Sequence, residues 1–356
     1  MSPLNDVDGR FLALLECPRD HSALRLEHGR LCCAHGHGYP IVNGVPVFLL
    51  AEKQQTIGIA TASLAAAESA AGAPLYVETL GISEREKRGV IGDAAADGRI
   101  DAVISYLIGA TSGRGYLDLI GRLETYPIPD VPIERGDGEL LLDIGCNWGR
   151  WSVSAARKGW RVVAIDPSLG AIMAARRAFS GFGADIAWVC GDARFLPFKA
   201  KAFRCAFSYS VIQHFSEADA QLAIAEIGRV LRRDGFAKIQ MAHKGGLRSI
   251  YARTRADYLD GGSFRVRYWS LAAMREVFAK DIGPTRLSAE AFGGLGLLGE
   301  DRSFVPLKVK VLISISMMLK TLAKAVPALI KFADSVYVVA TKREQCRPVA
   351  RSPSTD

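Results

Sequence analysis

The chain has 356 residues, of which 49% are hydrophobic and 23% are charged, and this is typical of a globular protein with one large α/β domain and a smaller module. Its net charge of +8 suits an anionic partner such as nucleic acid or a membrane surface, but the charges are scattered along the sequence. Seven cysteines, an odd number placed mostly in apolar runs, exclude a disulfide framework and indicate a reducing compartment, so we expect a cytoplasmic protein.

Neither a secretory signal nor a transmembrane helix is predicted. The first eleven residues lack a basic segment followed by an apolar one. The longest apolar stretch, 309–330, is interrupted by three lysines and a proline, so it is too broken to span a bilayer.

Residues 1–50 are expected to form a module of their own. Two short pieces, 17–20 and 32–35, each place two residues between candidate metal ligands, a spacing that suits a tight turn around one tetrahedral ion. The candidate ligands are Cys17, Asp20 (or His21), Cys32 and His35.

With the tail YPIVNGVPVFL at 39–49, these pieces resemble the zinc-ribbon modules that occur alone, as small activators of translation-related methyltransferases, or fused to methyltransferases. The resemblance implies a structural zinc ion. The alternative is a metal-free β-ribbon whose cysteines pack as small hydrophobic residues.

Residues 51–138 predict a helical linker or cap. The segment 51–75 is rich in alanine, and apolar residues recur at helical intervals through 85–123, so we expect two or three helices. Prolines at 127, 129 and 132 indicate an extended crossing into the next domain.

The stretch 139–168 predicts a strand, a glycine turn, a helix and a second strand. Leu140–Leu142 is an unbroken apolar run, as in a parallel strand buried on both faces, and Asp143 follows it. Gly145 and Gly149 open the helix, whose N-terminus offers unpaired N–H groups to a ligand. Asp166 ends the second strand, about twenty residues beyond the turn, where a carboxylate usually binds a ribose diol.

The glycine spacing separates two classes of nucleoside ligand. A dinucleotide fingerprint requires G-x-G-x-x-G, whereas here Gly145, Asn147 and Gly149 lie two residues apart and the bulky Trp148 and Arg150 stand between and beyond them. This argues against NAD. The pattern D-x-G-x-N-x-G instead resembles the first motif of class I S-adenosylmethionine-dependent methyltransferases, whose ligand carries no phosphate.

Later segments extend this resemblance over 139–242. Ile186–Cys190 predicts the third strand, followed by Asp192, and 203–210 predicts the fourth, although the family more often has an aspartate near 204–205. Residues 218–232 predict an amphipathic helix, and a fifth strand is expected at 237–241. The implied fold is a doubly wound, mainly parallel, seven-stranded Rossmann-like sheet with an antiparallel last strand at 335–341.

The resemblance implies that the loop from Asp143 to Gly149 holds the methionine end of the cofactor, Asp166 the ribose, and Asp192 and Ala193 the adenine. The full set of implied cofactor contacts is Asp143, Gly145, Cys146, Asn147, Gly149, Asp166, Asp192, Ala193 and Ser210. The loop after the fourth strand faces the methyl group, which makes Tyr209, Ser210, Gln213 and His214 the polar candidates near the reacting atom. For a hydroxyl acceptor His214 could serve as a base, and the alternative is that it only anchors the loop.

Residues 243–343 are expected to recognise the acceptor and complete the sheet. The segment 247–270 carries five arginines and five aromatic residues, which suit an anionic group or a ring, although a solvated basic helix is the more ordinary interpretation. A helix is expected at 271–278. For 308–331 we expect a helix, either packed on its own domain, which is favoured, or lying in a membrane interface. Residues 344–356 predict a disordered tail.

The sequence therefore predicts an S-adenosylmethionine-dependent methyltransferase that acts on a small-molecule or lipid-like acceptor. Two alternatives stay open. Basic charge and zinc-ribbon fusions also occur among RNA-modifying methyltransferases, so rRNA or tRNA is the alternative acceptor, although no Asn-Pro-Pro-Tyr-type motif is present. A non-catalytic scaffold that binds S-adenosylmethionine is the other.

Overall fold

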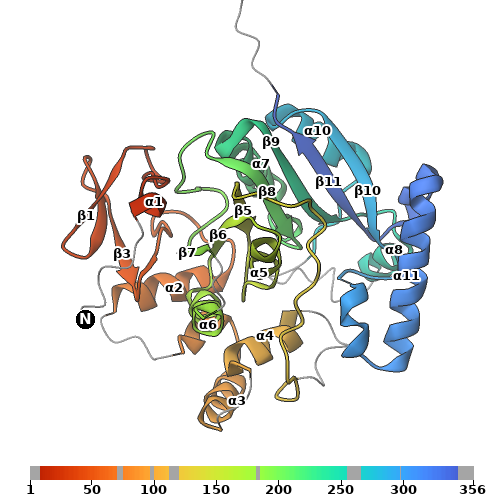
Figure 1. The fold of residues 1–356 in the computed structure, drawn as a ribbon, viewed down its shortest axis with the longest axis horizontal. Helices are drawn as coiled ribbons and strands as arrows, with labels where there is room; N and C mark the ends of the chain where they lie inside the picture. The colour runs from red at the N-terminus through yellow and green to blue at the C-terminus, as the bar shows by residue number, and fades with distance from the viewer. Residues whose placement is uncertain are drawn as a thin grey trace, which may run out of the picture.

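The computed structural model contains two β-sheets, joined by a helical segment (Figure 1). It describes residues 9–69, 75–96, 100–111, 120–181, 185–254, 266–296 and 298–343. Residues 344–356, for which a disordered tail is expected, lie outside these ranges, as does part of the basic and aromatic segment 247–270.

The larger sheet has seven strands in the order β10-β11-β9-β8-β5-β6-β7. Every neighbouring pair from β9 to β7 is parallel, and β11 runs antiparallel between β9 and β10. This confirms the predicted Rossmann-like methyltransferase sheet with its antiparallel last strand. The strands are β5 (Leu140–Ile144), β6 (Arg161–Asp166), β7 (Ile186–Cys190), β8 (Phe203–Tyr209), β9 (Leu231–Ala242), β10 (Thr285–Ala291) and β11 (Ser335–Thr341).

Helices cover both faces of this sheet because successive residues of its strands point to opposite sides. Leu142 belongs to a core shared with α7 (Glu217–Val230) and α10 (Leu271–Asp281). Leu141 belongs to a second core, on the other face, with α4 (Ala102–Thr111), α5 (Arg150–Arg157) and α6 (Leu169–Phe179). The apolar run read in the sequence is therefore buried on both sides.

The N-terminal module begins with α1 (Gly9–Leu12) and forms an antiparallel sheet in the order β1-β2-β3-β4. Its strands are β1 (Leu24–Glu27), β2 (Arg30–Cys33), β3 (Gly38–Val42) and β4 (Val45–Pro46). It joins the large sheet directly, because the backbone N–H of Phe48 donates to the carbonyl of Cys190 at 2.7 Å, where β7 ends. The expected β-ribbon module is present and adjoins the ligand end of the sheet.

Among the described residues of 51–138, three α-helices and a 3-10 turn, η1 (Val77–Leu80), follow the module, in agreement with the expected two or three helices. They are α2 (Gly58–Glu68), α3 (Glu84–Ala95) and α4. Ser83 and Glu86 form a capping box at the start of α3. Contacts of η1 and α4 with α6 attach this segment to the face of the sheet that α5 and α6 cover.

Two boundaries differ from the sequence prediction. Helix α7 ends at Val230 rather than at 232, because Leu231 already pairs with Phe203 and the residues before Phe236 form a bulge in β9. The stretch 308–331 is not one helix: α11 (Leu307–Ala325) ends before Pro327, which opens a 3-10 helix, η5 (Pro327–Phe332).

The remaining described elements are α8 (Leu247–Arg253) and the 3-10 helices η3 (Ile212–His214) and η4 (Gly299–Ser303). Within the described ranges, no helix is both long and apolar enough to cross a membrane.

Candidate cofactor and acceptor site

The loop between β5 and α5 is held in a tight left-handed path. Gly145, Asn147 and Gly149 have φ values of 72°, 49° and 83°. A Cβ on Gly145 would lie 2.1 Å from Val211 Cγ2, and one on Gly149 would lie 2.5 Å from the ring of Trp188. The loop is thus closed from both sides by neighbouring side chains, and a larger residue at either glycine would force it open.

Asp166 is joined to this loop by its carboxylate. Its two oxygens accept the backbone N–H groups of Asn147 and Ser168, each at 2.9 Å. Burial raises the pKa of Asp166 to about 6, against the opposing effect of these two hydrogen bonds. Each oxygen still has a lone pair to offer, so the carboxylate can accept further hydroxyl groups while it holds the loop.

Asp143 lies behind the loop. It is 1% exposed and accepts the Ser152 hydroxyl at 2.5 Å, which ties the end of β5 to α5. Burial raises the pKa of Asp143 to about 7, and the nearby charge of Asp166 adds to the rise. Its observed role is to fix the helix that follows the glycine turn.

Asp192 follows β7, as the sequence predicts, but its carboxylate is engaged by an arginine. Arg194 donates to both carboxylate oxygens through Nε and Nη2, with the shortest contact at 2.6 Å. The same guanidinium donates to Asp219 at 2.7 Å and to the carbonyl of Gln54 at 2.9 Å. An adenine amino group bound at Asp192 would therefore share the carboxylate with Arg194. The two-residue spacing of Asp192 and Arg194 in the sequence is consistent with this ion pair.

A buried polar cluster lies at the carboxyl ends of β8 and β9. Tyr209, which ends β8, pairs in register with Gln240 of β9, and Gln240 pairs with Tyr337 of β11. The ring of Tyr209 lies 4.7 Å from that of Trp151, in the first turn of α5. Glu290 of β10, which is 2% exposed, accepts the hydroxyl of Ser335.

Several polar atoms of this cluster have no hydrogen-bond partner in the described structure. They are both amide atoms of Gln240 and Oε1 of Gln213, together with the Tyr209 hydroxyl and Oε1 of Glu290. Tyr209 and Glu290 lie close enough for a hydrogen bond between them to affect the pKa of each, although no well-aligned bond is formed. Burial raises the pKa of Glu290, and burial followed by the charge of Glu290 raises that of Tyr209. Buried polar groups without partners are uncommon in proteins and indicate a place where a ligand or water completes the bonding. Gln240 and Glu290 were missed from the sequence because they lie within strands, without a motif.

The other predicted residues of this region lie at its edge. Ser210, which has a φ of 63°, accepts a hydrogen bond from Gln213 Nε2 at 2.7 Å. His214 ends η3, and its carbonyl accepts from Arg267. Cys146 is buried in the glycine loop, and Ala193 is buried just after Asp192.

The N-terminal module gathers a different metal-ligand set from the one that spacing suggested. The clustered groups are Cys17, Asp20, Cys33 and His37, whose ligand atoms all lie within 4.8 Å of one another. The set contains Cys33 and His37 in place of Cys32 and His35, and His35 contacts Asp20 from outside the set. Strand alternation is the reason: Cys33 of β2 faces inward and is 8% exposed, and its neighbour Cys32 points to the opposite side.

The three separations from His37 are close to those of a tetrahedral site, and the sulfur of Cys33 lies 3.9 Å from Oδ2 of Asp20. Nδ1 of His37 lies 3.4 Å from the sulfur of Cys17, 3.3 Å from that of Cys33 and 3.2 Å from Oδ2 of Asp20. Ligands about 2.0–2.3 Å from one zinc ion would be separated by about 3.3–3.8 Å. His35 has a side chain that is 67% exposed, and its Nδ1 lies 2.9 Å from Asp20 Oδ2 at the rim of the cluster.

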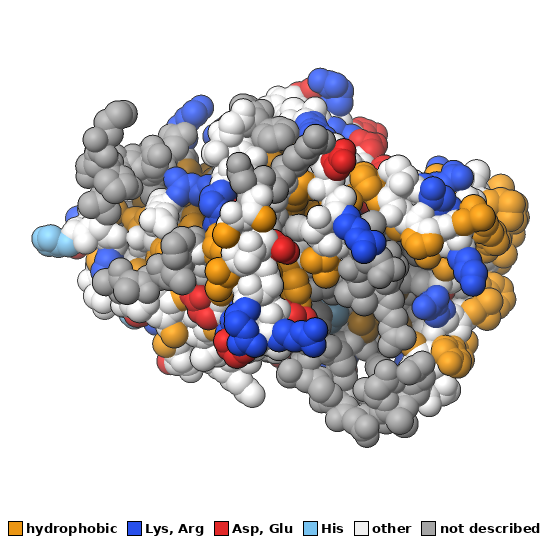
Figure 2. Space-filling view, turned by 90° about the horizontal axis from the view of Figure 1, so that it is seen from below, with side chains coloured by type: hydrophobic (Ala, Val, Ile, Leu, Met, Phe, Trp, Pro, Cys, Tyr) orange, Lys and Arg blue, Asp and Glu red, His pale blue; other side chains and the backbone are white. Residues whose placement is uncertain are grey.

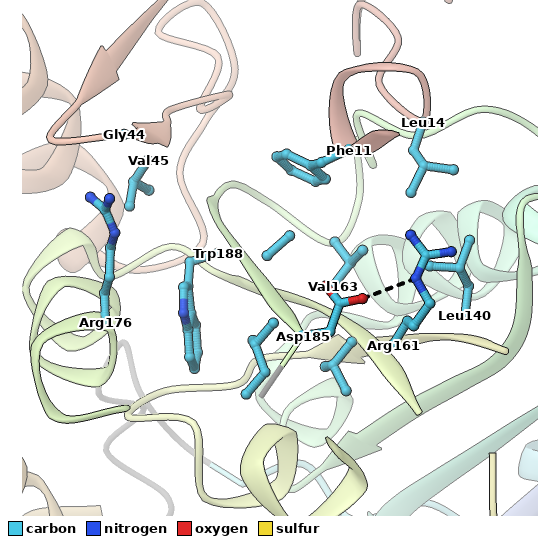
Figure 3. A pocket seen from close by; sticks show the side chains of 13 residues that line it. Phe11, Leu14, Gly44, Val45, Leu140, Arg161, Val163, Arg176, Asp185 and Trp188 are labelled. Carbon is cyan, nitrogen blue, oxygen red and sulfur yellow. Dashed lines mark hydrogen bonds and ion pairs between the residues drawn. The ribbon is translucent and has the colours of Figure 1, made fainter. Parts of the chain in front are cut away.

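A cavity of about 150 Å³ lies at the other end of the large sheet (Figure 3). Phe11 and Leu14 of the N-terminal module face it from one side, and Arg161 and Asp185, joined at 3.1 Å, face it from the start of β6 and the residue before β7. Open α/β sheets bind ligands beyond the carboxyl ends of their strands. This cavity is at the amino ends, so it is a seam between the module and the sheet and not part of the candidate site.

The glycine loop, Asp143, Asp166 and Asp192 fall within one segment that matches a known family. Residues 141–235 match the model of a methyltransferase domain. This domain match begins in β5 and ends in the bulge of β9, so it covers the strands that carry the glycine loop, Asp166 and Asp192.

The chain is similar to two curated proteins and to one solved structure. The chain is 36% identical over 111 residues to the biotin biosynthesis bifunctional protein BioHC of Cellvibrio japonicus, covering 31% of this chain and 21% of that protein. It is 27% identical over 158 residues to the ubiquinone biosynthesis O-methyltransferase of Azorhizobium caulinodans, covering 43% of this chain and 56% of that protein.

The solved structure is phosphoethanolamine N-methyltransferase 2 of Haemonchus contortus in complex with S-adenosyl-L-methionine, with a TM-score of 0.44 and 18% identity, covering 67% of this chain and 57% of that one. The chain thus spans between about a fifth and somewhat more than half of the length of these three proteins.

Proposed function

We propose that the chain is an S-adenosylmethionine-dependent methyltransferase that acts on a small-molecule or lipid-like acceptor. The observation that carries the proposal is the link between the glycine loop and Asp166. The Asn147 N–H anchors the carboxylate beside the loop, within a domain that matches a methyltransferase family. The glycine loop allows a close approach of the backbone to the ligand, and Asp166 is an acceptor for ribose hydroxyls. A nucleoside without phosphates requires both features.

When bound, S-adenosylmethionine supplies a sulfonium methyl group, which passes to the acceptor by direct displacement. The chain's own residues bind and orient. Asp166 accepts the ribose hydroxyls, the loop from Asp143 to Gly149 approaches the methionine end, and Asp192 and Ala193 stand where the adenine edge is expected. Arg194 holds the Asp192 carboxylate in place through their ion pair.

The acceptor is proposed to enter the polar cluster of Tyr209, Gln240 and Glu290. Tyr209 ends the strand beside β5, so it lies on the same edge of the sheet as the glycine loop. An acceptor with a hydroxyl or amine group would supply partners for the unpaired amide of Gln240 and carboxyl oxygen of Glu290. Glu290 then competes with His214 as the group that takes a proton from a hydroxyl acceptor.

We also propose that Cys17, Asp20, Cys33 and His37 hold a structural zinc ion. Two thiolates, one imidazole and one carboxylate are ligand types that zinc accepts, and the separations reported above suit a single ion. All four protein ligands would be used, as in a structural site rather than a catalytic one. The two positions that differ from the sequence prediction, Cys33 and His37, make the proposal specific.

The cofactor proposal is tested by calorimetry with S-adenosylmethionine and S-adenosylhomocysteine. We expect binding by the wild type and its loss in Asp166→Ala. Asp185→Ala is the matched control, because Asp185 is an exposed acid that precedes the next strand and pairs only with Arg161 among the described side chains. Binding of NADH without a response to S-adenosylhomocysteine would overturn the assignment.

The acceptor class is tested with cofactor labelled in its methyl group and a cell extract that is separated into RNA, protein, lipid and small-molecule fractions. We expect label in the lipid or small-molecule fraction, and none with Asp166→Ala. Label in RNA alone would contradict the proposed acceptor, and cofactor binding without label in any fraction would favour a scaffold.

A further inference from the structure

We propose that α11 docks the protein on the surface of an anionic lipid bilayer. The helix presents a row of exposed aliphatic and methionine side chains, spaced four, four, three and four residues apart, which places them on one helical face. They are Leu307, Val311, Ile315, Met318 and Leu322, with exposed fractions of 75%, 51%, 46%, 61% and 47%. We call them the apolar stripe. In Figure 2, hydrophobic side chains gather at the edge of the molecule that α11 forms.

The stripe is not the face by which α11 packs on its own domain. Ile313 and Ser316 are its buried residues, and the Ser316 hydroxyl accepts the N–H of Phe292, just beyond β10, at 2.9 Å. Two residues along a helix turn the side chain by about 200°, so Ile313 and Ile315 point in nearly opposite directions. The helix therefore has two apolar faces, and the sheet uses one of them.

The charges of α11 favour an anionic partner. Between Leu307 and Ala325 the helix contains lysines at 308, 310, 320 and 324 and no acidic residue, and Lys331 follows in η5. Lys308, Lys324 and Lys331 are exposed, whereas Lys320 lies over the ring of Tyr337 on the side of the sheet. Lysine stems can lie along apolar surface while their ammonium groups reach outward to phosphate. Anionic headgroups attract such clusters, whereas a neutral surface gains only the burial of the stripe.

Helix α8 also exposes apolar and basic side chains, and its start lies near η5. Leu247, Ile250 and Tyr251 are exposed by 69%, 46% and 62%, and the helix also carries Arg248 and Arg253. Its start adjoins η5, because a Cβ on Gly245 would lie 2.7 Å from the carbonyl oxygen of Lys331. Aliphatic and aromatic side chains mixed with basic ones are typical of helices that lie in a membrane interface.

A bilayer is favoured over a second copy of the chain. Because α11 carries four lysines and no acidic residue, a symmetric pairing of two α11 helices would place two basic helices side by side. A bilayer also requires no shape complementarity from a convex helix. Because α11 is not long and apolar enough to span a membrane, the expected mode is peripheral, with the helix lying in the headgroup region.

The test is co-sedimentation of the full chain with vesicles of phosphatidylcholine alone or mixed with phosphatidylglycerol. We expect binding to the mixed vesicles that is about tenfold or more stronger and that weakens as salt is added. A variant with Val311→Ser, Ile315→Ser and Met318→Ser should lose most of this binding, and so should Lys308→Gln with Lys310→Gln and Lys324→Gln.

The matched control replaces three equally exposed apolar residues elsewhere, Leu26→Ser, Ile91→Ser and Leu222→Ser. It should bind vesicles as the wild type does. Circular dichroism and melting temperature show whether each variant is folded. Equal binding to both vesicle types, no binding by the wild type, or a wild-type dimer that the stripe variant converts to a monomer would each overturn the proposal. Because the readout is binding, the result does not depend on whether the chain transfers methyl groups.

Discussion

Three buried acids lie near the proposed cofactor and acceptor positions, and each is held differently. Asp166 accepts two backbone N–H groups, Asp143 accepts a serine hydroxyl, and Glu290 accepts a hydroxyl while one of its oxygens has no partner in the described structure. Burial raises the pKa of all three. They are therefore the residues whose protonation and bonding a bound ligand would change most.

Asp143 is expected to make the protein less stable as pH rises. Its folded pKa of about 7 exceeds the ordinary value of 3.8, so the folded state binds the proton more tightly. The resulting stabilisation is complete below the unfolded pKa and is lost as pH rises through the folded pKa. Between pH 5 and pH 8 the free energy of unfolding should fall by about 3 kcal/mol on account of this group.

Asp143→Asn keeps the size of the side chain and an acceptor for Ser152 but cannot ionise. In urea unfolding at pH 5 and pH 8, we expect the variant to gain stability over the wild type mainly at pH 8. Asp185→Asn, at an exposed acid, should follow the wild type at both pH values. If the free energies of unfolding of the wild type and Asp143→Asn changed equally with pH, the buried carboxyl of Asp143 would not be the cause of the pH dependence.

Glu290→Gln separates the acceptor role from folding and cofactor binding. The change removes a buried ionisable group and retains its size, so we expect the melting temperature to hold or rise. Methyl transfer to the labelled fraction should fall by about tenfold or more, while calorimetric binding of S-adenosylhomocysteine stays unchanged. Glu276→Gln, on the exposed side of α10, is the control. Full activity in Glu290→Gln would remove Glu290 from the acceptor site.

At the scale of elements, the turn between β5 and α5 depends on the absence of a side chain. Gly149→Ala would require a left-handed backbone at an alanine and would bring a Cβ to within 2.5 Å of Trp188. We expect a loss of about 2 kcal/mol or more in unfolding free energy, together with weaker cofactor binding.

Gly89→Ala is a control for this change. Gly89 lies within α3, and a Cβ there would meet no atom within 4 Å. It should stabilise the protein by about 0.5–1 kcal/mol, because alanine favours a helix. Chemical denaturation measures both variants, and a harmless Gly149→Ala would show that Trp188 and the loop can move apart.

Elements with strong local patterns could be predicted from the sequence, and sites made by contacts between distant segments could not. The apolar run at Leu140–Leu142 identified a strand because burial on both faces of the sheet dictates those residues. The helical spacing of apolar residues in 308–331 did not show that the α-helix ends before Pro327. Ligand spacing pointed to Cys32, whereas the pairing of β2 turns Cys33 inward. Gln240 and Glu290 meet Tyr209 only through the register of four strands, which no single segment encodes.

At the scale of the whole molecule, the N-terminal module and the large sheet are linked near the proposed adenine position. Phe48 bonds to Cys190 at the end of β7, and Gln54, beyond the module, accepts from Arg194, which holds Asp192. Disorder in the module would therefore weaken the hydrogen bond between Arg194 and Gln54 and, through Arg194, disturb the position of Asp192. A zinc ion would stabilise the module and, through these contacts, the cofactor site.

Cys33→Ser and Cys32→Ser provide a matched pair, because the two residues are adjacent on β2 and only Cys33 belongs to the cluster. We expect elemental analysis to find one zinc per chain in the wild type and in Cys32→Ser, and a much reduced content in Cys33→Ser.

The melting temperature should fall by several degrees in Cys33→Ser and on addition of a strong chelator to the wild type, since metal binding contributes directly to folding free energy. The affinity for S-adenosylhomocysteine should fall with it, because Arg194 and Asp192 lose the support of the module. If Cys32→Ser lost zinc and Cys33→Ser retained it, the ligand set that spacing suggests would be correct. If the wild type contained no zinc and the chelator did not change its melting temperature, the module would be a metal-free β-ribbon.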